Sequence, residues 1–264
     1  MRINWKKTAI VTLDIALAVY LVFAFTKFNK PDESNKLCSK VNINIQDEVT
    51  NGFLDAKEIK RRLEQKKLYP LEKPLKNVNA RKIEETLMQS PFVKSAECYK
   101  TEGGLVDINL TQRMPIVRIK SINNEDYYVD DHQQIMPNTK YTSDLIIATG
   151  YISKSFAQRY ISILSKSLME NDLWRNQIEQ INVLPDKGIE LIPRVGNHII
   201  FIGYLPETQY IKKRQQDIQG FVNKKMERLE KFYKYGLSKA GWNKYAYINL
   251  EFDNQIICKR HLDS

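Results

Sequence analysis

A run of seventeen residues with a single charge lies close to the N-terminus and limits where the rest of the chain can fold. Residues 9–25 read AIVTLDIALAVYLVFAF, and Asp14 is the one charged residue. A hydrocarbon core about 30 Å thick needs about 20 apolar residues, so this run is at the short end of what spans a membrane. Three basic residues precede it, which predicts a cytoplasmic N-terminus. We therefore predict a cytoplasmic stub at residues 1–8 and a single-pass signal anchor at residues 9–26 in the inner membrane.

Two alternatives concern this segment. A cleaved signal peptide is less favoured, because the apolar run is longer than the usual core of a signal peptide and ends in VFAFTKF, a poor small-x-small cleavage site. Asp14 is costly inside a membrane unless it pairs with a partner helix or reaches the cytoplasmic interface, and the sequence leaves both open. Under the anchor prediction the bulk of the chain is periplasmic.

Length, composition and charge limit the domain number and the binding partners of the rest of the chain. A chain of 264 residues has room for an anchor and two modest domains, and 42% apolar with 27% charged residues is typical of folded proteins. The formal net charge of +10 suits anionic lipid, an anionic wall polymer, an acidic partner or nucleic acid. Nucleic acid is the least favoured, because the sequence has no phosphate-binding loop, zinc-finger spacing or RNA-binding aromatic motif.

The polar segment 27–40 reads as a linker, and a β-α-α-β-β pattern follows it. Alternation of apolar and polar residues predicts strands, and apolar residues spaced three or four apart predict helices. The predicted elements are a strand at 41–45, a turn at Asn51-Gly52, helices starting near Asp55 and Asn79, and strands at 93–101 and 105–111 joined by a turn at 102–104.

The second half of the chain predicts a mixed β-domain with a long helix near its end. The predicted elements are a helix at 156–168, strands at 178–183, 189–192 and 198–202, a helix at about 207–235, and two final strands at 245–252 and 255–259. In the long helix we predict an apolar stripe of Ile211, Ile218, Val222, Leu229 and Phe232. Its basic face is predicted to be solvated, with contact to a partner or to the cell wall as the alternative; the face consists of Lys212, Lys213, Lys224, Lys225 and Arg228.

Two motifs at matching positions resemble those of a known family. SPFVKSA at 90–96 precedes the 93–111 hairpin, and QRMPIV at 112–117 follows it. Together they resemble the POTRA domain of the FtsQ/DivIB cell-division family. The resemblance implies an α+β fold, with a POTRA domain at 41–119 and a partner-binding β-domain at 120–264. Residues 127–137 resemble the hairpin that follows POTRA in that family, and residues 145–150 resemble its next short segment. One departure is Gln255, which follows Phe252-Asp253-Asn254 where the family often has Gly.

The resemblance also implies a function without catalysis. An FtsQ-type protein is a divisome scaffold that binds an FtsB–FtsL-like complex at the septum and helps control septal peptidoglycan synthesis. Its last strand is a free sheet edge, which can accept a strand of the partner. The predicted partner-binding residues are Glu251, Phe252, Asn254, Ile256 and Lys259, with Glu251 as a charge at the rim. The alternative for Phe252 and Ile256 is that they belong to the sheet core.

The residues themselves give no enzyme signature. The sequence has no Gly-x-Ser-x-Gly elbow, Walker loop or paired-His helix motif, so we expect no catalysis, cofactor or small-molecule substrate. Asp130-Asp131-His132 resembles a metal site, but consecutive turn residues seldom converge on one ion, so we expect no metal. Two alternatives remain: another POTRA-type assembly or transport adaptor, and a membrane-tethered wall enzyme with two buried carboxylates.

Three widely spaced cysteines, Cys38, Cys98 and Cys258, form neither a disulfide framework nor a zinc set. Either one pair is bridged, or all three are small buried apolar residues in strands.

Overall fold

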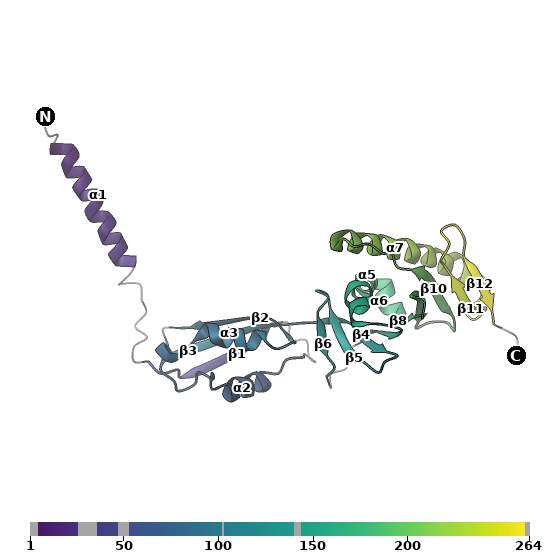
Figure 1. The fold of residues 1–264 in the computed structure, drawn as a ribbon, viewed down its shortest axis with the longest axis horizontal. Coiled ribbons are helices and arrows are strands. Elements are labelled where there is room, and N and C mark those ends of the chain that lie inside the picture. The colour runs from purple at the N-terminus through teal and green to yellow at the C-terminus, as the bar shows by residue number, and fades with distance from the viewer. Residues whose placement is uncertain (1–4, 26–35, 47–52, 102, 140–143, 262–264) are drawn as a thin grey trace. The chain divides into compact units, whose positions relative to one another are not determined.

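The computed structural model describes residues 5–25, 36–46, 53–101, 103–139 and 144–261, with the side chains of 5–9 left out (Figure 1). The chain divides into two compact units. The first consists of Met1–Ile45, Ala56–Leu87 and Ala96–Leu110, and the second of Gln46–Asp55, Met88–Ser95 and Thr111–Ser264. The predicted domain boundaries at 41–119 and 120–264 stay predictions.

The apolar N-terminal run forms helix α1 (Trp5–Phe23). Within the described residues, no helix combines the length and the apolar character that crossing a membrane requires. The anchor predicted for residues 9–26 stays a prediction.

The first unit has the predicted β-α-α-β-β order. After α1, the elements that lie wholly or mostly in it are, in chain order, β1 (Lys40–Gln46), α2 (Ala56–Gln65), a 3-10 turn η2 (Leu75–Asn77), α3 (Ala80–Met88), β2 (Val93–Lys100) and β3 (Leu105–Gln112). The strands form one sheet in the order β1-β3-β2. The turn predicted at Asn51-Gly52 lies outside the described residues.

Apolar stripes and a cap explain these elements. Helix α2 buries Ile59 and Leu63, and α3 buries Ile83 and Leu87. The side chain of Asn79 accepts a hydrogen bond from the backbone N–H of Lys82 at 2.9 Å, which caps α3 at the predicted start. The helices pack through these stripes and bury the apolar side of the unit.

Polar pairs link β1 to β3. Asn42 donates to Asp107 at 2.6 Å, and Asn44 donates to Asn109 at 3.0 Å. Both pairs join residues that are 65 positions apart in the sequence, so both favour the same register between the two strands.

The second unit is built on a nine-stranded mixed sheet in the order β12-β11-β10-β9-β8-β7-β4-β5-β6. Its strands are β4 (Pro115–Ser121), β5 (Asp126–Asp130), β6 (Ile135–Pro137), β7 (Ile146–Gly150), β8 (Ile178–Val183), β9 (Gly188–Pro193), β10 (Ile199–Tyr204), β11 (Tyr245–Asn249) and β12 (Ile257–Arg260). The pairs β4–β7, β7–β8 and β10–β11 are parallel, and the other pairs are antiparallel.

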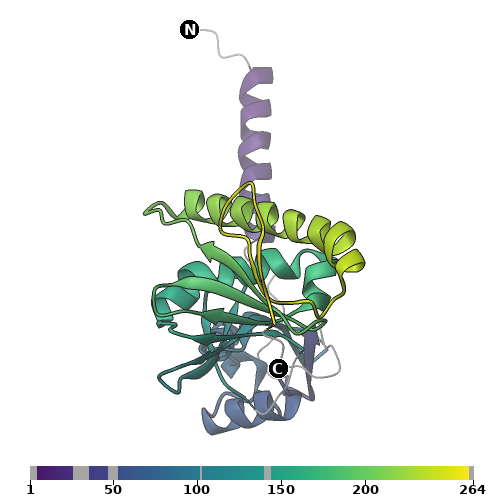
Figure 2. The same ribbon diagram turned by 90° about the vertical axis from the view of Figure 1, so that its right-hand side faces the viewer.

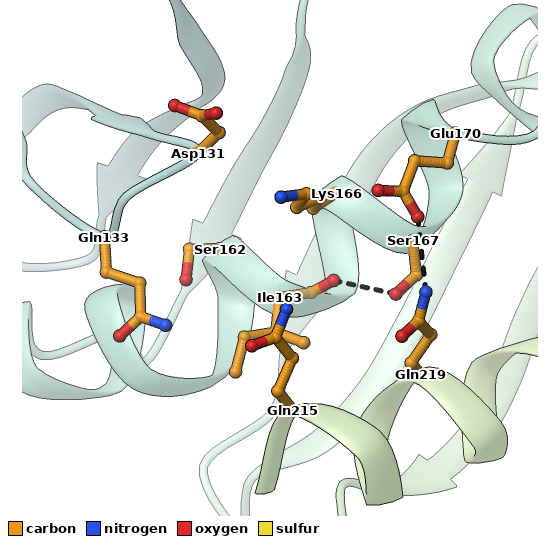
Figure 3. Close-up of a pocket in the computed structure, with 9 residues that line it drawn as sticks. All are labelled: Asp131, Gln133, Ser162, Ile163, Lys166, Ser167, Glu170, Gln215 and Gln219. Carbon is orange, nitrogen blue, oxygen red and sulfur yellow. Dashed lines mark hydrogen bonds between the residues drawn. The ribbon is translucent and has the colours of Figure 1, made fainter. Parts of the chain in front are cut away.

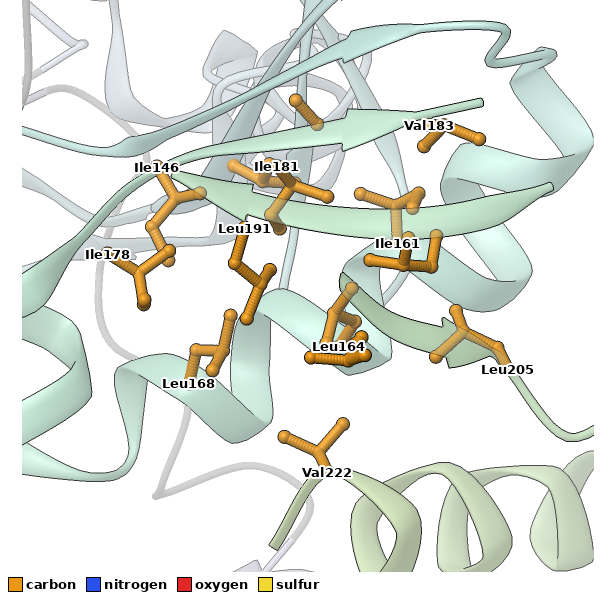
Figure 4. Packing of buried hydrophobic residues seen from close by; sticks show 14 of the residues in the cluster. Ile146, Ile161, Leu164, Leu168, Ile178, Ile181, Val183, Leu191, Leu205 and Val222 are labelled. Atoms are coloured by element: carbon orange, nitrogen blue, oxygen red, sulfur yellow. The ribbon is translucent and has the colours of Figure 1, made fainter. Parts of the chain in front are cut away.

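Helices cover one face of this sheet (Figure 2). They are α4 (Lys154–Phe156), the π-helical η3 (Ala157–Ile161), α5 (Ser162–Met169), α6 (Asp172–Gln177), α7 (Ile211–Phe232), the π-helical η4 (Tyr233–Leu237) and α8 (Ser238–Ala240). Leu164 and Leu168 of α5 and Val222 of α7 pack against Ile181 and Leu191 of the strands (Figure 4). The core of the unit therefore lies between α5, α7 and the sheet.

The opposite side of the central strands carries hydrogen-bonded polar side chains. Gln180 donates to Thr149 at 2.8 Å, and Asn182 donates to Glu190 at 2.8 Å. The Tyr247 hydroxyl donates to the other Glu190 oxygen at 3.1 Å. Burial and the nearby Glu190 carboxylate raise the pKa of Tyr247, so its phenol stays a donor.

Residues of both family-like motifs meet in a small aromatic cluster of the second unit. Phe92 stacks on Phe53 with ring centroids 6.0 Å apart, and Phe53 meets Tyr128 edge-on at 5.6 Å. The buried Gln112 side chain accepts a hydrogen bond from the Phe53 backbone N–H at 3.0 Å. Arg113 pairs with the buried carboxylate of Asp130 at 3.3 Å. The motifs thus have structural roles.

The long helix departs from prediction at two positions. Ile211, predicted in the apolar stripe, is 69% exposed because it is the first residue of α7. Lys225, predicted to face solvent, is only 3% exposed.

All three cysteines are free thiols, so no pair is bridged. Cys38 and Cys98 are buried, and burial raises the pKa of the Cys98 thiol to about 11. Cys258 is half-buried in β12, and Cys38 precedes β1, so the prediction of three buried strand residues is correct only for Cys98.

Candidate partner-binding edge

β12 is the last strand of the nine-stranded sheet and pairs only with β11 among the described residues. The pairing is antiparallel, with Tyr247 opposite Lys259 and Asn249 opposite Ile257. The other side of β12 therefore presents backbone N–H and C=O groups that an added strand can satisfy. We call residues 251–260 the β12 edge.

The side chains on one face of the β12 edge pack against the core, and those on the other face are exposed. Ile256 and Cys258 pack against the main core. Ile257, between them in sequence, is 48% exposed, and Lys259 is also exposed. Because successive side chains of a strand point to opposite faces, Ile257 and Lys259 lie on the face away from α7.

Helix α7 holds the turn that leads into β12. The Lys225 ammonium donates to the carbonyl oxygens of Leu250 and Glu251 at 2.7 and 2.6 Å. Arg228 donates to the carbonyl oxygen of Gln255 at 2.7 Å. Burial lowers the pKa of Lys225, and the nearby Asp253 carboxylate opposes this shift. These contacts fix the two ends of the turn to one helix.

Sequence reasoning missed this role of Lys225, although the sequence contains a signal for it. Lys225 lies three residues after Val222 and four before Leu229, both buried on the apolar stripe. Residues with that spacing share one helix face, so Lys225 had to point toward the sheet.

The predicted partner-binding residues fall into two environments. Phe252 is 47% exposed, so it is not part of the sheet core, and Asn254 is exposed beside it in the turn. Glu251 is half-buried, and its backbone N–H donates to the Asn249 side chain at 2.7 Å. Ile256 is half-buried against the core. Lys259 lies on the opposite face of the strand, so the five residues do not form one patch.

A surface groove of about 600 Å³ joins the turn to the end of α7. Its lining includes Arg228, Lys231, Phe232, Tyr235, Asn254 and Ile256. Two predicted residues therefore contribute to a groove with apolar and basic walls. Its size lies within the range of 300–1,000 Å³ that is typical of ligand pockets, at roughly the middle.

Two family models match successive parts of the chain. A POTRA-like domain model matches residues 36–111, and the model described as FtsQ/DivIB, C-terminal related, matches residues 114–259, more than half of the chain. The chain belongs to the FtsQ/DivIB family. No curated protein matches it. The POTRA-like match contains the part of the first unit that follows residue 35, and the second match contains all of the β12 edge except its last residue.

Two further features of this FtsQ/DivIB protein have the outward form of a site. One is a cavity of about 60 Å³ between α5 and α7, lined by Ser162, Ser167 and several glutamines (Figure 3). Ser162 donates to the Gln158 carbonyl at 2.6 Å, and Ser167 donates to that of Ile163 at 2.9 Å. The cavity has room for a few water molecules, so it is too small for a substrate.

The other feature is the Asp130-Asp131-His132 turn, whose possible ligand atoms lie within 4.8 Å of one another. One Asp130 oxygen accepts the backbone N–H groups of His132 and Gln134 at 2.9 and 2.6 Å, and the other pairs with Arg113. Asp130 therefore has a structural role in the β5–β6 turn of this division-associated POTRA protein. The family is generally one of non-catalytic scaffolds, and the expectation that this chain binds no metal stays a prediction.

Proposed function

We propose that this protein is a divisome scaffold that binds an FtsB–FtsL-like complex by accepting a partner strand at the β12 edge. The free side of β12 is the observation that carries the proposal. Core packing of Ile256 and Cys258 holds the strand in place, while Ile257 and Lys259 remain available on the other face. Binding here needs no catalytic group.

The groove beside the turn supplies specificity that backbone pairing lacks. Pairing along β12 gives hydrogen bonds that any sequence can form, whereas side-chain pockets select the partner. Phe232 and Tyr235 provide apolar walls, and Arg228 and Lys231 outnumber the one acidic lining residue, Asp253, so the groove is basic on balance. A partner segment with an apolar residue and acidic neighbours fits this lining. Glu251 at the rim disfavours an acidic residue placed directly opposite it.

The proposed role is to link early and late division proteins and so to help control septal peptidoglycan synthesis. We place the protein at the inner membrane of the division septum, with its N-terminus in the cytoplasm and the remainder in the periplasm. This location rests on the sequence of residues 1–26 and the family. A septal signal from a fluorescent fusion, with a membrane fraction that resists alkaline extraction, would support it.

The binding test uses the full chain, co-expressed with the FtsB-like and FtsL-like proteins of the same organism. Ile257→Glu places a charge on the exposed face of β12 without entering the core. Ile211→Glu is the matched control, because Ile211 is exposed and begins α7, a helix about 33 Å long, at the end away from the groove.

We expect Ile257→Glu to weaken capture of the pair about tenfold or more and Ile211→Glu to leave it unchanged. Equal capture by all three proteins would place the interface elsewhere. Absence of capture by the unmodified chain would remove the proposed partner.

A further inference from the structure

A second hollow lies on the other side of the end of α7 and has rigid aromatic walls. The Tyr233 ring meets those of Trp242, His198 and Trp174 edge-on, with centroids 5.1, 5.6 and 6.0 Å apart. The Tyr233 hydroxyl and the His198 Nε2 are 2.7 Å apart, within hydrogen-bond distance. Trp174 and His198 are 2% and 3% exposed, so they support Tyr233 from the core.

Three exposed apolar residues converge on this hollow, which we call the Trp242 hollow. Leu173 of α6, Val195 of the β9–β10 turn and Trp242 before β11 are 41%, 47% and 40% exposed. With Tyr233 they line a space of about 460 Å³, whose charged lining residues are Glu230 and Lys234. Single exposed apolar residues are common, but three from separate elements around one preformed hollow are typical of a binding site.

The Trp242 hollow lies close to the end of the β12 edge. Arg260, the last residue of β12, pairs with Tyr245, and Trp242 precedes Tyr245 by three residues. Three residues span at most about 10 to 11 Å. A strand added to β12 lies two spacings of about 4.8 Å from Tyr245, so a partner chain that continues past Arg260 can reach the hollow within about six residues. The π-helical segment η4, which contains Tyr233, forms one wall, and such segments are frequent at functional sites.

We propose that the Trp242 hollow receives one aromatic or large aliphatic side chain of the partner chain that pairs with β12. The inference rests on the proposed function, because the partner that pairs with β12 is the chain that would come within reach of the hollow. Its lining carries one acidic and one basic residue, so a side chain without net charge fits it best. Buried aromatic anchors in such pockets often supply much of the affinity of an interface.

Fluorescence of Trp242 tests occupancy directly. We would measure acrylamide quenching of the full chain in a Trp5→Phe background, with and without the co-purified FtsB-like and FtsL-like pair. Trp174 is buried and contributes a shielded, nearly constant signal. The proposal expects quenching of Trp242 to fall at least twofold in the complex, and Trp242→Phe to abolish the change.

Affinity provides the second readout. Leu173→Glu and Val195→Glu each introduce a charge at an exposed wall position, and Ile211→Glu is the matched exposed control. We expect binding at least tenfold weaker for both wall variants, with the control unchanged. Wild-type affinity of both wall variants and unaltered Trp242 quenching, with binding still lost in Ile257→Glu, would overturn the inference and leave the proposed function standing. No binding by the unmodified chain would overturn both.

Discussion

Replacement of Lys225 by Met tests whether α7 holds the turn into β12. The substitution keeps most of the side-chain volume and removes the ammonium that donates to the Leu250 and Glu251 carbonyls at 2.7 and 2.6 Å. A hydrogen bond from a charged donor contributes about 1.5–3 kcal/mol. Two effects reduce the total: Arg228 still lies 3.4 Å from the Leu250 oxygen, and Met avoids burial of a charge. We therefore expect the free energy of unfolding to fall by about 2 kcal/mol.

The neighbouring Lys224→Met variant is the matched control. Lys224 has a side chain that is 57% exposed and pairs with Asp253 at 2.8 Å, so its loss should change the free energy of unfolding by less than about 0.5 kcal/mol. Urea unfolding followed by circular dichroism measures both variants, and hydrogen exchange shows whether β12 amides open first in Lys225→Met. Equal stability of the two variants and the unmodified chain would refute the role given to Lys225.

Three further predictions concern stability. Asp130→Ala should lower the free energy of unfolding by about 3 kcal/mol, because it leaves Arg113 unpaired and two turn N–H groups without an acceptor, and urea unfolding measures this. Gly150→Ala should lower the free energy of unfolding by more than about 2 kcal/mol, because Gly150 has φ +96° and an added Cβ would collide with the Val183 carbonyl. Gly220→Ala should stabilise the protein slightly, because Gly220 lies on α7 with open space around its Cβ position. Melting temperatures of the two variants test this contrast. Burial and the charge of His261 lower the pKa of His198 from its usual 6.5. As the pH falls, the unfolded chain therefore takes up a proton before the folded chain does, and the free energy of unfolding declines below about pH 6.5. His198→Phe should flatten this decline in thermal melts between about pH 7 and about pH 5, and an unchanged slope would contradict the assignment.

The strands and helices of the first unit were predictable because the spacing of apolar side chains along the chain specifies them. Val106, Ile108 and Leu110 alternate with polar residues, and all three are buried on one side of β3. Asn79 is a preferred capping residue directly before an apolar helical stripe. In both cases the signal lies within a few residues of the element it specifies.

The order of strands in the second unit was not predictable in this way. β7 is paired on both sides with parallel strands, β4 and β8, and β10 is parallel to β11 although 40 residues separate them in the chain. Such pairings depend on crossover connections and on core packing, not on local alternation. The sequence predicted the individual strands and the position of β12 at an edge of the sheet. It did not predict the order in which the strands pair.

The candidate site shows the same division between local and tertiary information. The edge follows from the terminal strand pattern, whereas Lys259 was predicted from the family resemblance. The buried Lys225 and the groove at the end of α7 depend on how a distant helix crosses the sheet, so basic residues on that helix were all assigned to solvent. The Trp242 hollow likewise combines α6, the β9–β10 turn and η4.

The central claim, that the β12 edge accepts a partner strand, is tested most directly by hydrogen exchange of the backbone amides of Ile257–Arg260. The full chain would be compared alone and in complex with the FtsB-like and FtsL-like pair. Strand addition predicts that the amides on the free side of β12 exchange at least tenfold more slowly in the complex, because each gains a hydrogen-bond partner. Unchanged exchange along β12, with protection confined to other strands or to the first unit, would contradict the claim.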